Sequence, residues 1–182
     1  MFISQKLRQE NIAEYLLYMW QIEDIIRAYG CNLSELRKSY ISRFKELDAE
    51  QLDDLTDWYG NLIRMIREEG CVEKGHIQIN KLIIQQLTEL HQRLMGSSKF
   101  PFYNSEYYKV LPFIVELRQK GNKNISEIET CFNLLYGTML LRLQKKDITP
   151  QTQNAVNEIT TFIGMLSDYF KQDKEKDLFN EE

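Results

Sequence analysis

Glycine and proline divide this chain into segments of helical length, and that punctuation limits the folds open to it. Five glycines follow or separate segments whose apolar residues recur at helical spacing: Gly30, Gly70, Gly75, Gly96 and Gly121. Glycine is favoured there because helices commonly end on a residue in the left-handed conformation. We find no strand signals in the sequence. The chain is therefore predicted to be all-α.

Capping residues indicate where the helices begin. Asp48 is a candidate N-cap, Ser126 opens a capping box with Glu129, and Thr149 precedes a proline at a first helical position. Together with the glycines, these signals predict about six or seven helices. The expected ranges are 4–29, a short basic helix at 33–46, 49–69, 76–95, 105–120, 127–146 and 150–171.

The distribution of apolar residues predicts how these helices pack. Several helices carry one apolar stripe, whereas apolar residues cover well over half the circumference of helix 4–29. That helix is expected to be central in a bundle. Nothing in the 182 residues resembles a linker between two cores, so residues 1–171 are predicted to form one domain. The charged segment 172–182 is expected to be a disordered tail.

Three further glycines lie inside predicted helices: Gly60, Gly137 and Gly164. Each costs about 1 kcal/mol relative to alanine in a helix interior, so each is expected to have a reason. Two interpretations stay open. The glycine allows a close crossing with another helix, or it leaves room for a ligand beside a neighbouring aromatic residue.

Charge and composition exclude several classes of protein. A formal net charge of -4 argues against nucleic-acid binding, which relies on clustered Lys and Arg. The first residues lack the apolar run of a signal peptide, and no stretch approaches the roughly 20 apolar residues that span a bilayer. We therefore expect a cytoplasmic protein with no membrane partner.

The cysteines and histidines predict neither a disulfide framework nor a metal site. Three cysteines are an odd number without metal-type spacing, and Cys31 and Cys71 each follow a glycine, where a small apolar residue covers a last helical turn. His76 and His91 lie on one predicted helix, about 22 Å apart at 1.5 Å per residue. Phosphate-loop, dinucleotide and His-Glu-x-x-His motifs are absent. We expect no metal and no cofactor.

Polar residues at positions where apolar neighbours are expected are the main site candidates. Glu23 and Arg27 lie on the apolar face of the first helix at a spacing that lets them form an ion pair. His91 and Arg142 lie on the apolar faces of two later helices. Gathered in one partly buried cluster, the four would bind a polar ligand or carry acid–base chemistry. Alternatively, the charged groups reach solvent along their apolar stems and His91 is an ordinary core residue.

A second candidate region is the aromatic segment 100–108, which leads into a helix containing Pro112. Proline cannot donate a hydrogen bond to the carbonyl four residues before it, so a kink or a free acceptor is expected beside these rings. Tyr103 and Tyr107 are therefore further candidate ligand-binding residues. In the alternative interpretation, the aromatic residues close the end of the core and a polar residue of the segment caps the helix.

Three sequence strings carry a resemblance to a known family: NIAEYLLYMWQIED at 11–24, PFIVELR at 112–118 and EIETCFNLLYG at 127–137. Together they resemble an uncharacterised bacterial family catalogued as domain of unknown function 4924. The resemblance covers nearly the whole chain. It implies an all-helical fold and a bacterial cytoplasmic setting, but it brings no activity and no catalytic residues.

Two functions remain open from the sequence. The first is a non-enzymatic, helical protein-interaction module that self-associates, because catalytic motifs are lacking and Tyr, Trp and Phe are available for interfaces. Its expected partner is a second copy of the chain, in a homodimer, or an unidentified protein. The alternative is a small-molecule-binding protein or enzyme that uses the Glu/Arg/His cluster, with the aromatic segment as a lid.

Overall fold

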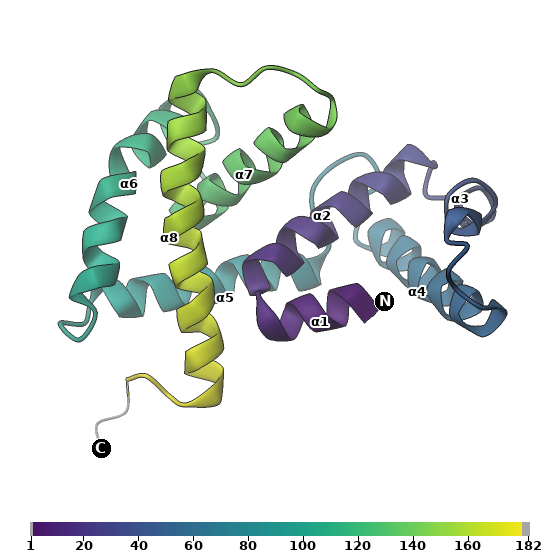
Figure 1. The fold of residues 1–182 in the computed structure, drawn as a ribbon, viewed down its shortest axis with the longest axis horizontal. Helices are drawn as coiled ribbons and strands as arrows, with labels where there is room; N and C mark the ends of the chain where they lie inside the picture. The colour runs from purple at the N-terminus through teal and green to yellow at the C-terminus, as the bar shows by residue number, and fades with distance from the viewer. Residues whose placement is uncertain (1, 180–182) are drawn as a thin grey trace.

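The computed structural model describes residues 2–179 as an all-helical fold (Figure 1). Eight α-helices and one short 3-10 helix follow one another along these residues, so the prediction of six or seven helices is corrected to eight. Their bounds are α1 Phe2–Glu10, α2 Ile12–Ala28, α3 Leu33–Ser39, η1 Ile41–Arg43, α4 Ala49–Glu68, α5 Gln78–Met95, α6 Pro101–Lys120, α7 Glu127–Leu143 and α8 Pro150–Glu175. No helix in this range is both long and apolar enough to cross a bilayer.

The first predicted helix is in fact two helices, which meet at Asn11. The Asn11 side-chain oxygen accepts hydrogen bonds from the backbone N–H groups of Ala13 and Glu14, both at 3.1 Å, and so caps α2. Ser167 of α8 donates to the same oxygen at 2.9 Å. These bonds favour a helix start over a continuous helix, because asparagine side chains compete with the backbone for hydrogen bonds. As a result α1 folds back along α2 (Figure 1).

Helix α2 is central, as predicted for the first long apolar helix. It contacts α1, α4, α5, α7 and α8, and it crosses the middle of the molecule between the α3–α4 pair and the group formed by α5 to α8 (Figure 1). Leu16 and Ile26 of α2 are fully buried. Helix α8 packs against α2, α5, α6 and α7. The core therefore lies along α2 and α8.

Helices α2 and α4 end in the same way, on a glycine followed by a buried cysteine. Gly30 and Gly70 have positive φ values of 63° and 69°. The N–H groups of Cys31 and Cys71 donate back to carbonyls five residues earlier, at 2.9 and 2.8 Å, as in a Schellman motif. Both thiols are buried, which confirms that these cysteines cover the last helical turns.

Several predicted boundaries are corrected by the structure. Helix α6 begins at Pro101 rather than at 105, because proline is favoured in the first turn of a helix, and the aromatic segment becomes part of the helix. Helix α5 begins at Gln78, which leaves His76 in the preceding loop. Residues 33–46 contain α3 and η1 rather than one helix, and α7 ends at Leu143.

The C-terminal segment is also ordered further than expected. Helix α8 continues to Glu175, and Phe179 packs against the core beside Phe100, with 5.5 Å between ring centroids. Arg93 of α5 holds the segment by ion pairs to Asp173 at 3.0 Å and to Asp177 at 3.6 Å. Helix α8 thus continues past its predicted end at 171, and ion pairs join the segment predicted to be a disordered tail, 172–182, to α5 at residues 173 and 177. Residues 180–182 lie outside the described part of the chain.

The three glycines inside helices have different surroundings. A Cβ added at Gly60 would lie 3.2 Å from Leu33 Cδ2, which confirms a close crossing between α4 and the start of α3. At Gly137 and Gly164 an added Cβ would meet nothing within 4 Å. Packing within the chain therefore explains only the first of the three.

Backbone conformation and surrounding space predict opposite effects of alanine on stability at Gly70 and at Gly164. We expect Gly70→Ala to lower the free energy of unfolding by about 1 kcal/mol, because alanine is strained at positive φ. We expect Gly164→Ala to raise it by about 1 kcal/mol, because alanine is the better helix former and has room there. Urea denaturation followed by circular dichroism measures both changes. A change of the same sign in both variants would contradict this account.

Candidate functional site

The carboxylate of Glu23 is the most buried charged group in the described residues. The residue is 1% exposed, and its two oxygens reach the N-terminal end of α5. Oε1 accepts from the Ile77 backbone N–H at 3.0 Å and from the Asn80 side-chain amide at 2.7 Å, while Oε2 lies 2.6 Å from His76 Nδ1. Ile77 occupies the N-cap position of α5 and has no side-chain oxygen. Glu23 thus provides from α2 the negative charge and acceptor that a helix N-terminus favours.

Arg27 lies one turn after Glu23 on α2 and connects this helix to the loop before α5. Its Nη2 is 3.8 Å from Glu23 Oε2, which confirms the predicted ion pair. Its Nε donates to the Cys71 carbonyl at 3.0 Å, and Nη2 also donates to the Gly75 carbonyl. Asp24 accepts from Arg27 Nη1 at 2.8 Å. Two of the donors of this guanidinium therefore hold the loop, and a third bonds to Asp24 within α2.

A small pocket lies beside this network. Trp20 stacks on the His76 ring, with 4.0 Å between centroids and 12° between planes. The pocket has a volume of about 50 Å³ and is lined by Trp20, His76, Asn80, Lys81, Ile84 and Glu129. Two buried polar atoms in this region, Trp20 Nε1 and Asn80 Oδ1, have no hydrogen-bond partner. Ligand sites for ordinary metabolites are several times larger, at roughly 300 Å³ or more, so only a very small polar group fits here.

The Glu23–His76 pair has the geometry that orients a catalytic imidazole, and it also joins α2 to the loop before α5. A carboxylate on Nδ1 fixes the ring and leaves Nε2 free to act as a base. The Cys71 thiol bonds to the His76 carbonyl oxygen at 3.3 Å and not to the ring. Within residues 2–179, no group of three His, Cys, Asp or Glu side chains is arranged to hold a metal ion.

A second polar cluster lies between α5, α6 and α7. His91 Nδ1 is 2.7 Å from the Tyr103 hydroxyl, and the His91 ring centroid is 4.9 Å from that of Tyr107. Tyr107 donates from its hydroxyl to Glu127 Oε2 at 2.8 Å, and Phe162 of α8 covers the three rings. The cluster joins four helices through aromatic packing and two polar bonds.

Burial determines the protonation of this second cluster. Desolvation lowers the pKa of His91, although the nearby Glu127 carboxylate partly opposes that shift. Burial also raises the pKa of Tyr103 and of Tyr107, and the Tyr107 shift is increased by its bond to Glu127. His91 and Tyr103 therefore form a neutral pair near pH 7, which suits a core.

The candidates predicted from the sequence occupy three separate places. Glu23 and Arg27 lie together in the first cluster, and His91, Tyr103 and Tyr107 lie together in the second. Arg142 is exposed at the end of α7 and donates to Gln153 of α8 at 2.9 Å. The single four-residue cluster is thus not formed. Helical periodicity gives the direction of a side chain around its own helix, but it does not say which other helix lies opposite.

Sequence reasoning also missed several members of these clusters. The sequence predicts His76 inside a helix, whereas it lies in the loop before α5, and nothing local connects it with Glu23, 53 residues earlier. Asn80 did carry a signal, because it is an amide between Ile77 and Ile84 on an otherwise apolar helix face.

Comparison with known proteins identifies a family but no relative with a known activity. The sequence model of a family described as "Domain of unknown function (DUF4924)" matches residues 1–177. No curated protein and no solved structure matches the chain.

The Glu23 network predicts a large loss of stability when the carboxylate is removed. We expect Glu23→Ala to lower the free energy of unfolding by about 3 kcal/mol or more, because Arg27, Asn80 and the Ile77 N–H lose a buried partner. Glu68→Ala, at an exposed carboxylate near the end of α4, is the matched control and should change it by less than about 0.5 kcal/mol. Urea denaturation of both variants measures the difference. Equal effects would show that the buried bonds contribute little.

The lowered pKa of His91 predicts a loss of stability in acid. The stabilisation from a neutral, buried His91 is fully present above the pKa of histidine in the unfolded chain, about 6.5. It is lost as the pH falls below that value, because the unfolded chain then binds the proton more readily. Unfolding free energies of the protein and of His91→Phe, measured from about pH 8 to about pH 5, should show a shallower decline in the variant. Parallel curves would exclude this contribution.

Proposed function

We propose that the chain, which belongs to the family described as "Domain of unknown function (DUF4924)", is a non-enzymatic, helical interaction module that self-associates through α6. We place it in the bacterial cytoplasm, and its three buried, free cysteines suit a reducing compartment. The exposed apolar face of α6 carries the proposal.

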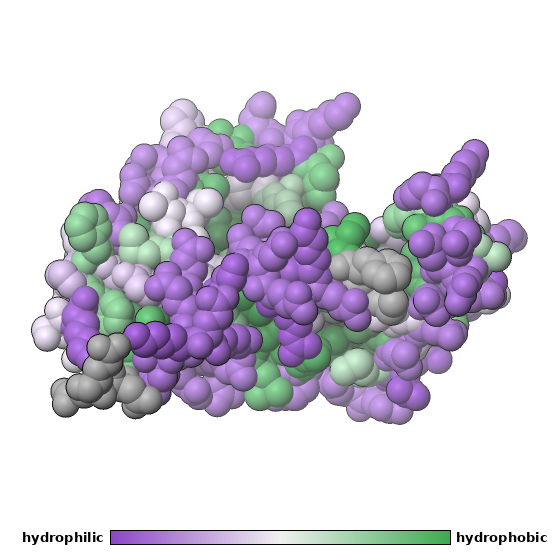
Figure 2. All heavy atoms as spheres, turned by 60° about the horizontal axis from the view of Figure 1, so that its bottom comes forward, coloured by the Kyte–Doolittle hydropathy of each residue, from purple (hydrophilic) through white to green (hydrophobic). Residues whose placement is uncertain are grey.

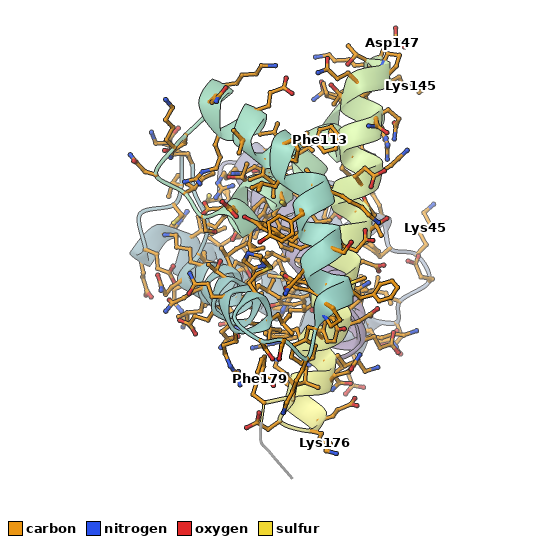
Figure 3. All side chains as sticks on the ribbon, turned by 90° about the vertical axis from the view of Figure 1, so that its left-hand side faces the viewer. Lys45, Phe113, Lys145, Asp147, Lys176 and Phe179 are labelled. Atoms are coloured by element: carbon orange, nitrogen blue, oxygen red, sulfur yellow. The ribbon has the colours of Figure 1, made fainter. Side chains whose placement is uncertain are left out.

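That face consists of four residues at helical spacing: Tyr108, Leu111, Pro112 and Val115. Tyr108 is 63% exposed and Val115 is 45% exposed, although both are large and apolar. The opposite face of α6 provides Tyr103, Val110 and Ile114 to the core. Packing within the fold therefore explains the apolar residues of that face, but not those of the exposed face. In Figure 3, α6 lies in front of α8 and no other helix covers its outer side. Such apolar stripes commonly mark protein interfaces.

The charges beside the stripe favour a second copy of the chain as the occupant. Two ion pairs flank the stripe, Lys109 with Glu106 and Lys120 with Glu116. In an antiparallel, two-fold arrangement about the centre of the stripe, Tyr108 of one copy meets Val115 of the other, and equivalent flanks face each other. Lys109 then lies within about one helical turn of the other copy's Glu116, opposite in charge. The surface is thus complementary to itself.

Removing the stripe should abolish self-association. We expect the protein to sediment as a dimer and the double variant Tyr108→Asp/Val115→Asp to sediment as a monomer, with the dissociation constant raised by about a hundredfold or more. Leu82→Asp is the matched control, because Leu82 of α5 is also 45% exposed and lies outside the stripe. Sedimentation equilibrium over a concentration series measures all three. A monomeric parent protein, or equal weakening by the control, would rule out the α6 interface.

A charge exchange tests the antiparallel arrangement separately. Lys109→Glu and Glu116→Lys should each weaken the dimer, because each places like charges on facing flanks. The double variant Lys109→Glu/Glu116→Lys should restore the affinity. Additive weakening in the double variant would show that the two residues do not meet across the interface.

A further inference from the structure

A second surface feature lies where α1, the start of α2 and the last turns of α8 meet (Figure 1). Here a pocket of about 420 Å³ opens to solvent, within the range of sites for small molecules. Ile12 and Phe170 supply its apolar floor, and Arg8, Lys171 and Lys174 lie around it. The Asn11–Ser167 hydrogen bond at 2.9 Å holds the two sides together.

The three cations of this pocket have no carboxylate partner. Among the described residues, Arg8, Lys171 and Lys174 form no ion pair and no hydrogen bond through their side chains, whereas most other arginines do. Two of the three are instead held by aromatic rings. Arg8 Cζ lies 5.8 Å from the centre of the Tyr15 ring, and Lys174 Nζ lies 4.2 Å from that of Phe170. A ring face attracts a cation without using its N–H groups, so these donors stay available.

Two like charges, those of Arg8 and Lys174, line this pocket together. Burial, and then the positive charge of Arg8 on the same pocket wall, lower the pKa of Lys174. Two carboxylates, Glu10 and Glu175, also line the pocket. Glu10 lies 3.9 Å from Lys6, so part of its charge is already balanced. Hydrophilic residues dominate this side of the molecule (Figure 2).

We infer that this pocket binds a small organic anion. A carboxylate or phosphate group lies between Arg8 and Lys174 and accepts their free hydrogen bonds, which relieves their repulsion. A short apolar body rests on Ile12 and Phe170. The pocket is formed by α1, α2 and α8 and contains no residue of α6, so this inference does not depend on the proposed dimer.

Phenyl phosphate is a suitable probe, because it combines a ring with an anionic group. In calorimetric titrations at low salt we expect saturable binding that weakens as sodium chloride is added. Inorganic phosphate should bind more weakly, and benzyl alcohol, which has the ring without the charge, should not bind. Phenylacetate in a parallel titration distinguishes a carboxylate from a phosphate preference. Equal binding of benzyl alcohol, or no saturable binding of either anion, would overturn the inference.

Two variants locate the binding and separate it from folding. Arg8→Gln/Lys174→Gln should weaken phenyl phosphate binding by about tenfold or more without lowering the Tm, because the exchange removes a repulsion. Lys123→Gln/Lys146→Gln changes the net charge equally on other surfaces and should retain the affinity. Equal loss in both double variants would show non-specific charge attraction. A lowered Tm in the first would show that its cations serve the fold, and either result would overturn the inference.

Discussion

The fold depends on a carboxylate that is almost completely removed from water. Burying a charge costs several kcal/mol unless its partners are in place. Glu23 is therefore stable only when the start of α5 and the loop before it have reached their final positions. Its bond to the Ile77 N–H spans 54 residues of sequence, and it determines where α5 begins. Helix α5 in turn contacts α6 and α8, and its Arg93 forms an ion pair with Asp173 of α8. One buried side chain thus links α2 to the helix on which α6 and α8 also pack.

Local signals in the sequence were sufficient for several helix ends. The glycines after α2 and α4, the Asp48 and Ser126 caps and the proline at the start of α8 all function as predicted. Each of these signals acts within about one turn of its own helix, so it needs no knowledge of the tertiary structure. The ion pair between Glu23 and Arg27 was predictable for the same reason.

What the sequence could not supply is the contact between distant segments. The break at Asn11 is reinforced by Ser167, 156 residues later, and the ordered end of the chain depends on Arg93 of α5. The composition of residues 172–179 favours disorder, and only partners elsewhere in the molecule reverse that preference. The separation of Arg142 from His91 has the same origin, because two helices that both carry a polar residue on an apolar face need not face each other.

The matching ends of α2 and α4 are also connected to each other. Arg27, near the end of α2, donates to the carbonyl of Cys71, while Arg67, near the end of α4, donates to the carbonyl of Cys31, both at 3.0 Å. Each arginine therefore donates a hydrogen bond to the carbonyl group just after the end of the other helix. If either end unwinds, the cysteine carbonyl at the other end loses its hydrogen-bond donor. The two termini consequently behave as one cooperative unit, whose amides should exchange with solvent through a shared opening rather than by independent fraying.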